Sequence, residues 1–549
     1  MNNIVFISDF FLDEAMGGAE KCNEAFINKI SGTYNVTKKK STLVTVDFIK
    51  NHREDFFIIA NFFGLSQKVK IALGDCDYII YEHDHKYVSN NNPSTYKNFE
   101  IPIRNIINID FYSLAKAVLC QSTFHSEILY KNTLLTNIVN LSGNIWSDED
   151  LELLNKNISN DKNIKNAIMR SGNRNKGESA AVRYCKSNNI EFDYIESQSY
   201  ESFINNLSKV ENLYFFPQWV ETYNRVSIEA RILGCKLITN NLIGVTKESY
   251  YKLKGKELLD FIKKNNDNVV NKILNVVEQK EVEFFKTTGI PKVTFITSMY
   301  KGAKFIEHFL KNITSLDLFE TSEVLIFDSN SPENEYSICK PYLEKYDNIK
   351  YKRLEKNYSP TEVLNLGIKE STGEYLTTAP IDDVRDKLYL RWMIKSLLET
   401  GEDTCLVYGE CLQTNTPNET INLNTASSIY EHSKQDFSRE NMIKSLPGPM
   451  PVWKKNIHKE IGYFNTKYRY CADWELWLRM VNKGYKFRKL NKIIGLYYFN
   501  KQGLTTSDDT KAEKNTEEAE VFFKFKETFG ESNYKRYFSY FNQFRRNND

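Results

Sequence analysis

The sequence has almost no excess charge and no long apolar run, and each absence excludes a class of protein. It holds 73 Lys and Arg against 71 Asp and Glu, which gives a formal net charge of +2. Domains that coat nucleic acid are usually strongly basic, so we expect no nucleic acid partner. The longest apolar stretch, residues 56–65, is about half of what a membrane-spanning helix needs. We therefore expect at most peripheral membrane contact.

The sequence also lacks paired cysteine motifs and a secretory leader. Its nine cysteines are scattered and odd in number, and none follows the Cys-x-x-Cys spacing. This pattern favours reduced thiols over a disulfide framework or a zinc site. The first residues, MNNIVFISDFF, have neither the basic start nor the apolar core of a signal peptide. We expect a cytoplasmic protein that at most contacts the inner face of the membrane peripherally.

What the chain does have is a regular alternation of strand and helix patterns. Its 549 residues are enough for three or four compact units. Apolar runs such as FFIIAN, YIIYE, AVLCQS, NLYFFP and EVLIFDS alternate with amphipathic helical segments. This alternation predicts an α/β protein with parallel, doubly wound sheets in both halves.

Breaks in the pattern predict the domain boundaries. A polar stretch that ends in Gly289 and Pro291 reads as a linker, and a second break lies near residues 155–165. The aromatic and basic tail either packs on the preceding domain or lies on a membrane surface. The predicted segments are two lobes at 1–155 and 156–286, a linker at 287–291, an α/β domain at 292–510 and a helical tail at 511–549.

Carboxylates follow two predicted strands of the second half. Asp328 ends the strand EVLIFD, where ligands of open α/β sheets bind. Asp382 and Asp383 follow the strand EYLTT, and such a pair suits Mg²⁺ or Mn²⁺, which would bridge a pyrophosphate. The alternative is an acidic turn that caps the next helix.

A third carboxylate, Asp473, precedes the amphipathic helical pattern WELWLRM. Large apolar neighbours desolvate a carboxylate and raise its pKa, as a general base requires. The alternative is that Asp473 is a helix N-cap.

The ordered set DSNS, GEY, Asp-Asp, GYFN and ADWELWLR resembles glycosyltransferase family 2, over about residues 291–510. The resemblance implies an inverting enzyme with the GT-A fold. It also implies that Asp328 and Asp382 contact the nucleotide, Asp383 binds the metal and Asp473 deprotonates the acceptor hydroxyl. Two positions depart from the family pattern. Ile381 replaces an acidic residue, and Asn500 stands where a late histidine is common.

The first half carries a second set of motifs. Gly17 and Gly18 precede a helical pattern, where either the backbone amides meet an anion or the glycines serve plain loop geometry. Glu221 and Glu229 are separated by seven residues, and a carboxylate in that context can bind a ribose diol. In RSGNRNKGE, cations including Arg170, Arg174 and Lys176 lie before a helix, where only an anionic ligand would favour them.

These motifs look like those of glycosyltransferase family 4, retaining enzymes with the GT-B fold of two Rossmann-like lobes. The resemblance implies that Lys176 and a nearby arginine, Arg174, bind the diphosphate. It further implies that Glu229 holds the ribose, that Glu221 lies near the donor sugar and that His83 lies near the reacting centre. Two lobes within about 285 residues are short for this family.

His83 has two other interpretations. It is either a loop histidine held by a neighbouring backbone group or, with His85, part of a zinc site that has no third ligand in view.

The two resemblances together predict a two-domain glycosyltransferase that uses nucleotide-sugar donors. Its acceptor would be a glycan, a lipid-linked oligosaccharide or a glycoprotein. A second hypothesis makes only the C-terminal half catalytic, with the N-terminal half as a glycan-acceptor binding or scaffolding module. A third treats the whole chain as a non-catalytic assembly subunit.

Overall fold

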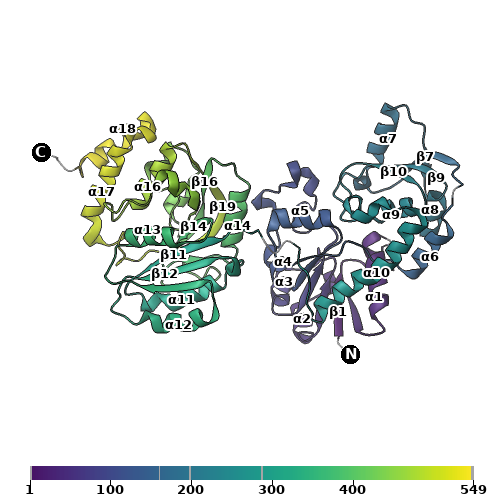
Figure 1. Ribbon diagram of the computed structural model, residues 1–549, viewed down its shortest axis with the longest axis horizontal. Coiled ribbons are helices and arrows are strands. Elements are labelled where there is room, and N and C mark those ends of the chain that lie inside the picture. The colour runs from purple at the N-terminus through teal and green to yellow at the C-terminus, as the bar shows by residue number, and fades with distance from the viewer. Residues whose placement is uncertain (1–2, 16, 160, 197–198, 286–288, 546–549) are drawn as a thin grey trace. The chain divides into compact units, whose positions relative to one another are not determined.

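The computed structural model describes residues 3–15, 17–159, 161–196, 199–285 and 289–545. The chain divides into two compact units, Met1–Thr288 and Gly289–Asp549, which Figure 1 shows as ribbons. The predicted linker at 287–291 begins beside this division, and its residues 287 and 288 lie outside the described part of the chain. None of the described helices is long and apolar enough to cross a membrane.

The first unit begins with a lobe built on a parallel six-stranded sheet in the order β2-β1-β3-β4-β5-β6. Its strands are β1 (Asn3–Ser8), β2 (Asn35–Lys40), β3 (Phe56–Ile59), β4 (Tyr78–Tyr81), β5 (Ala117–Cys120) and β6 (Ile138–Asn140). Its helices are α1 (Gly18–Ile30), α2 (Val46–Asn51), α3 (Gln67–Leu73), α4 (Ile109–Leu114) and α5 (Thr123–Thr133). Strands β3, β4 and β5 are buried along their whole length, because helices cover both faces of a parallel sheet.

The second lobe has a parallel four-stranded sheet in the order β10-β9-β7-β8. Its strands are β7 (Ile164–Met169), β8 (Asp193–Ile195), β9 (Val210–Phe215) and β10 (Lys236–Thr239). Its helices are α6 (Asp148–Lys156), α7 (Glu178–Ser187), α8 (Tyr200–Leu207), α9 (Arg225–Ile232) and α10 (Gly255–Val277).

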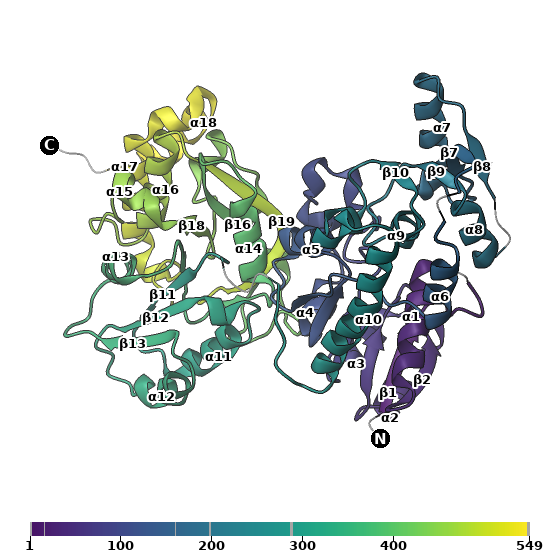
Figure 2. The same cartoon turned by 45° about the vertical axis from the view of Figure 1, so that its right-hand side comes forward.

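Helix α10 ties the two lobes together. Leu258 and Ile262 near its start belong to the core of the second lobe, whereas Val269 and Ile273 belong to the core of the first. Figure 2 shows α10 running from the second lobe to the first. The chain therefore returns to the first lobe, which a division at residue 155 does not describe.

The second unit contains one mixed nine-stranded sheet in the order β13-β12-β11-β14-β18-β16-β19-β15, with β17 beside β16. Its strands are β11 (Val293–Met299), β12 (Glu323–Asp328), β13 (Ile349–Arg353), β14 (Tyr375–Thr378), β15 (Val384–Arg385), β16 (Thr404–Thr414), β17 (Ser428–Ile429), β18 (Val452–Lys454) and β19 (Lys486–Tyr498). The prediction of a parallel sheet is right for β11 to β14 and for the pair of β16 with β19, and wrong for β18, which pairs antiparallel with both β14 and β16.

The helices of the second unit surround this sheet and continue into the tail. They are α11 (Ala303–Thr314), α12 (Glu335–Lys345), α13 (Pro360–Glu370), α14 (Tyr389–Leu398), α15 (His458–Ile461), α16 (Ala472–Asn482), α17 (Lys511–Lys524) and α18 (Gly530–Asn542). The start of α13 is set locally, since Ser359 and Glu362 form a capping box and Pro360 occupies the first turn.

The aromatic tail packs on its own domain, as one of the two predicted alternatives requires. Phe522 of α17 stacks on Phe541 of α18 at a ring distance of 4.3 Å, and Trp474 of α16 lies 6.1 Å from Phe529. These rings are buried in one hydrophobic core. Burial of one such side chain contributes about 1.5–3 kcal/mol, so the tail is a structural part of the second unit.

Candidate functional site

The acidic pair of the second unit lies in a turn between two strands. Strand β14 ends at Thr378 and β15 begins at Val384, so Asp382 and Asp383 do not end a strand as predicted but precede one. Asp383 is buried and accepts a hydrogen bond from the amide of Tyr498 at 3.2 Å. Burial and the neighbouring charge of Asp382 raise the pKa of Asp383 well above its usual range, and burial also raises the pKa of Asp382.

This pair has the chemistry of a divalent cation site. Among the described residues, no lysine, arginine or histidine is within ion-pairing distance of either carboxylate, and the side chain of Asn500 hydrogen-bonds to Asp382. No cluster of three or more His, Cys, Asp or Glu side chains in the described ranges is placed to hold a metal. Two carboxylates are nevertheless what Mg²⁺ or Mn²⁺ needs from a protein when water and phosphate oxygens complete the shell.

Asp328 ends β12 and is fully buried. Its Oδ1 accepts a hydrogen bond from the amide of Ser331 at 2.7 Å, and its Oδ2 accepts hydrogen bonds from the hydroxyl of Tyr351 and from Arg353, both at 2.6 Å. Asp328 therefore organises the loop that follows β12 as well as the half-exposed guanidinium of Arg353. Arg353, rather than the fully buried Asp328, is the group exposed at this edge.

Asp473 is the second residue of α16 and lies in its first turn. The N-cap of this helix is Cys471, so the prediction of Asp473 as the N-cap is wrong. Ser445 donates a hydrogen bond of 2.8 Å from its hydroxyl to Oδ2 of Asp473. Burial raises the pKa of Asp473 above its usual value. A partly buried carboxylate with a raised pKa has the properties of a general base.

Tyr430 connects Asp473 to the acidic pair. Burial raises the pKa of its hydroxyl, and the charges of Asp473 and Asp383 both add to that rise. Both carboxylates therefore lie near this one side chain, although 90 residues separate them in the sequence. The structure thus brings the predicted metal ligand and the predicted base to one side of the sheet.

In the first unit, a hollow of about 340 Å³ lies between the two lobes. It joins the loops after β1, β7 and β8 with the first turns of α8 and α9, at the carboxyl ends of parallel strands, where ligands of such sheets bind. Its lining residues are Gly17, Gly18, Lys21, Met169, Arg170, Ile195, Ser199, Tyr200, Phe203, Arg225, Val226 and Glu229. Three predicted site residues, Gly17, Gly18 and Glu229, are thus brought together.

The hollow contains charged groups that the sequence motifs did not single out. Lys21 lies 3.4 Å from the ring centre of Tyr200 and pairs with Asp150 at 2.9 Å. Arg225 pairs with the same carboxylate at 2.6 Å, and Tyr200 donates a hydrogen bond of 2.8 Å to Glu229. Burial raises the pKa of Glu229. The position of Lys21, one helical turn after the glycines, could have identified it as a site residue from the sequence. No sequence pattern marks Arg225.

The other predicted donor-binding residues do not line the hollow. Lys176 pairs with Glu221 at 2.8 Å, and Arg174 is exposed in the same short turn. Gly177 is required here, because its φ is +75° and a Cβ would lie 1.7 Å from the carbonyl oxygen of Phe216. The turn at residues 174–177 therefore lies close to the end of β9. Its Lys176 is paired with Glu221 of the protein itself.

His83 is buried between side chains rather than held by a backbone group, so that interpretation is wrong. Its Nε2 lies 3.0 Å from Oδ1 of Asn23, and its Nδ1 lies 2.7 Å from the amide nitrogen of Gln121. Burial lowers the pKa of His83 to about 4. With both nitrogens engaged, the ring is neutral near pH 7 and belongs to a polar network with Asn23, Gln121 and Thr222.

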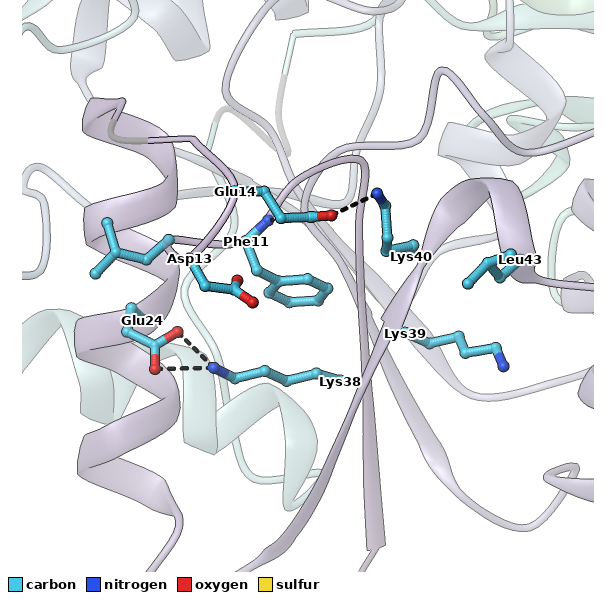
Figure 3. Close-up of a pocket in the computed structure, with 9 residues that line it drawn as sticks. Phe11, Asp13, Glu14, Glu24, Lys38, Lys39, Lys40 and Leu43 are labelled. Atoms are coloured by element: carbon cyan, nitrogen blue, oxygen red, sulfur yellow. Dashed lines mark hydrogen bonds and ion pairs between the residues drawn. The ribbon is translucent and has the colours of Figure 1, made fainter.

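A larger hollow of about 790 Å³ lies at the edge strand β2, away from all predicted residues (Figure 3). Two of its cations are paired, since Lys38 meets Glu24 at 2.6 Å and Lys40 meets Glu14 at 2.6 Å, while Lys39 lies 4.8 Å from the ring centre of Phe48. Lysines on an edge strand commonly oppose pairing with another chain. This hollow therefore has a structural explanation.

Comparison with known proteins assigns the second unit. Residues 294–462 match the model of Glycosyl transferase family 2. The chain is 24% identical over 176 residues to the poly-beta-1,6-N-acetyl-D-glucosamine synthase of Staphylococcus epidermidis, covering 32% of this chain and 42% of that protein. The chain thus spans less than half the length of this relative.

Two solved structures are also similar. The structure of Staphylococcus aureus TarS 1–349 in complex with UDP-GlcNAc has a TM-score of 0.37 and 18% identity, and covers 45% of this chain and 73% of that one. The mannosyltransferase PcManGT from Pyrobaculum calidifontis, in complex with GDP-Man and Mn²⁺, has a TM-score of 0.34 and 19% identity, and covers 43% and 64%.

The family match confirms one of the two predicted resemblances. The second unit contains a glycosyltransferase family 2 domain. The matched region includes Asp328, Asp382 and Asp383 and ends before Asp473 and the tail. The resemblance of the first unit to family 4 stays a prediction.

Proposed function

We propose that the second unit transfers a sugar, with inversion, from a nucleotide-sugar donor to a hydroxyl of a glycan, lipid-linked or protein-linked acceptor. One observation carries this proposal. Asp382 and the buried Asp383 form no ion pair among the described residues, although the charge of Arg385 lowers the pKa of Asp383, and Asp383 lies with Asp473 near Tyr430. Such a site needs a cation on one side and has a base on the other.

In this mechanism the acceptor oxygen attacks the anomeric carbon while the bond to the diphosphate oxygen breaks. Asp473 takes the proton of the acceptor hydroxyl on its carboxylate, and its raised pKa suits that task near neutral pH. Ser445 holds one oxygen of Asp473, which leaves the other for the acceptor. Asp383 and Asp382 would hold Mg²⁺ or Mn²⁺, which stabilises the negative charge of the leaving nucleoside diphosphate when bound.

Asp328 and Arg353 are proposed to contact the nucleotide at the carboxyl end of β12. The carboxylate is already bonded to three protein groups, so its main role would be to hold Arg353 and the loop 329–331 in place. Arg353 is half-exposed and would meet the nucleotide directly.

For the first unit we propose a second nucleotide-sugar site in the inter-lobe hollow, with retaining chemistry. Support comes from Lys21, Arg170 and Arg225, which line the hollow beside the Gly17–Gly18 turn at the start of α1, where cations and a helix N-terminus suit a diphosphate. Glu229 would hold the ribose.

A specific observation favours the rival role of a glycan-acceptor binding module. The ion pairs Lys176–Glu221 and Lys21–Asp150 already satisfy the charges that a donor would use. A donor would have to break these pairs, whereas a neutral glycan would not.

We further propose that the product is a polysaccharide or glycoconjugate, because the Staphylococcus relative is named as the synthase of a polymer of N-acetylglucosamine.

The test of the proposed function measures nucleotide release from a panel of UDP- and GDP-sugars, with Mn²⁺, with Mg²⁺ and with a chelator. Metal-dependent release that Asp383→Asn removes would support the second unit as the enzyme. Release that survives chelation and is lost in Glu229→Ala would support an active first unit. Metal-dependent release that persists undiminished in Asp383→Asn would contradict the proposed site.

A further inference from the structure

Helix α17 lies beside α16 in both ribbon views (Figures 1 and 2), and it lies beyond the segment that matches the family model. The two helices share a core of aromatic rings, and they are also joined by polar contacts. These contacts centre on residues 467–471, the irregular segment that leads into the first turn of α16. Because Asp473 lies in that turn, whatever holds this segment also sets the place of Asp473.

Glu517 of α17 holds the segment through its backbone. Its carboxylate accepts hydrogen bonds from the amide of Arg469 at 2.9 Å and from the amide of Tyr470 at 2.8 Å. The thiol of Cys471, the N-cap residue, lies 3.7 Å from the same carboxylate. A carboxylate that accepts amide hydrogen bonds forms charge-assisted bonds, which are stronger than neutral ones.

Two further contacts come from the same helix. The hydroxyl of Tyr470 donates a hydrogen bond of 2.6 Å to Glu513, four residues before Glu517. Lys524, seven residues after it, pairs at 2.7 Å with Glu475, which is 1% exposed. Positions 513, 517 and 524 share one face of α17. This face therefore binds both the segment that leads into α16 and the first turn of α16.

Other charged groups of the tail and of the preceding loop face Asp473. Burial raises the pKa of Glu518, and the charge of Asp473 adds to that rise while Lys514 opposes it. Lys514 also lowers the pKa of Asp473 and of His432. The groups that face Asp473 are therefore Ser445, Tyr430, Cys471, Lys514 and Glu518, and two of them belong to α17.

We propose that Glu517 is a positioning residue of the transferase site: by binding the amides of residues 469 and 470, it sets the first turn of α16 and aims the carboxylate of Asp473 at the acceptor. Helix α17 is then a part of the active site rather than an appendage. This inference rests on the proposed role of Asp473 as the base. It goes beyond that role because it assigns a function to a segment outside the matched domain.

The test compares Glu517→Gln with a matched control, Glu527→Gln, whose side chain is 88% exposed in the same tail. Glutamine keeps the size of the side chain but removes the charge and presents an amide donor to two backbone donors. Hydrogen–deuterium exchange on the full chain should show at least about tenfold faster exchange of the amides at 469 and 470 in Glu517→Gln. The control should leave their exchange unchanged.

The kinetic readout is nucleotide release from the donor panel in the presence of Mn²⁺. A displaced base lowers the chemical step and not donor binding, so kcat should fall about 10- to 100-fold while KM for the donor stays constant. Asp473→Asn combined with Glu517→Gln should be no slower than Asp473→Asn alone, because the second residue acts through the first.

Unchanged amide exchange in Glu517→Gln overturns the inference, and this result does not depend on whether the panel contains a donor. Faster exchange with an unchanged kcat also overturns it. If Glu517→Gln does not fold, Glu517→Asp keeps the charge but shortens the side chain and withdraws the carboxylate from the same two amides, and unchanged exchange there also overturns the inference. If Asp473→Asn is fully active, the proposed function fails instead. The amide exchange at residues 469 and 470 still shows whether Glu517 holds this segment.

Discussion

The two units arrange their charged candidates in opposite ways. In the first unit the candidates pair with one another, as Lys176 does with Glu221 and Arg225 with Asp150. In the second unit Asp382 and Asp383 are adjacent like charges, and no cation among the described residues forms an ion pair with them. The pairs of the first unit balance their charges, whereas in the second unit burial and the charge of Asp382 raise the pKa of Asp383 and the charge of Arg385 only opposes that rise.

This difference separates two kinds of evidence for a ligand site. Repulsion between adjacent carboxylates is costly unless a cation binds or a proton is taken up, so the proposed metal site of the second unit would relieve it. A balanced pair has no such need, so the first unit points only to a site that a ligand would have to compete for. The predictions below change one side of this comparison at a time.

The largest effect is expected for Asp473→Asn. Loss of a general base should lower the rate of the second unit by about 10²- to 10⁴-fold, with donor affinity unchanged. Asp403→Asn, on the surface beside Lys486, is the matched control and should keep the rate. Full activity of Asp473→Asn would remove this residue from the mechanism.

The same variant should also be at least as stable as the parent. The folded-state pKa of Asp473 is raised, so the unfolded chain loses its proton first as the pH rises. Ionisation of this carboxyl therefore destabilises the folded state. The destabilisation begins as the pH passes the pKa of the unfolded chain and is complete once the pH exceeds the pKa of the folded protein. Thermal unfolding at neutral pH measures this, and a clearly lower melting temperature would contradict it.

The next effect is the pH dependence of metal binding. The metal takes up ionised carboxylates, and the pKa values of Asp382 and Asp383 are both raised above 3.8. Acidification should therefore weaken Mn²⁺ binding at pH values well above 3.8, by up to about tenfold per pH unit for each proton that competes. Calorimetric titration in a series of buffers measures this slope. Asp383→Asn should reduce it, and an affinity independent of pH would place the metal elsewhere.

In the first unit, Glu229→Ala should lower the free energy of unfolding by about 1–3 kcal/mol, because it leaves the buried hydroxyl of Tyr200 without its acceptor. Urea unfolding measures this change, with the exposed Glu211→Ala as the control. If nucleotide-sugar binding and product are unchanged in the folded variant, the first unit is a binding module and not a transferase.

The smallest effect on stability is expected for Lys176→Met. The pair with Glu221 is partly exposed, at 35% and 16%, and such pairs contribute about 1 kcal/mol or less. Binding of a nucleoside diphosphate to the first unit should nevertheless weaken about tenfold if Lys176 meets the phosphates. Lys186→Met, in the exposed last turn of α7, is the control. Equal affinity in both variants would exclude Lys176 from the site.

Much of the fold follows from local patterns. The apolar runs around residues 56–59, 78–81 and 117–120 are strands, and Asp328 ends its strand as expected, because strand burial and strand ends depend on neighbours in sequence. The antiparallel strands of the second sheet were not predicted, since the direction of a strand depends on partners far along the chain.

The sequence by itself determined which residue types stand at the ends of strands and at the starts of helices, and therefore the class of chemistry in the second unit. Only the tertiary structure decided how those residues are paired. It placed Lys176 on Glu221, Lys21 and Arg225 on Asp150, and Glu517 on the entry to α16. These contacts join residues 45 to 129 positions apart, and no local pattern encodes them. Their geometry arises when sheets and helices pack, because side chains distant in sequence then share one buried volume.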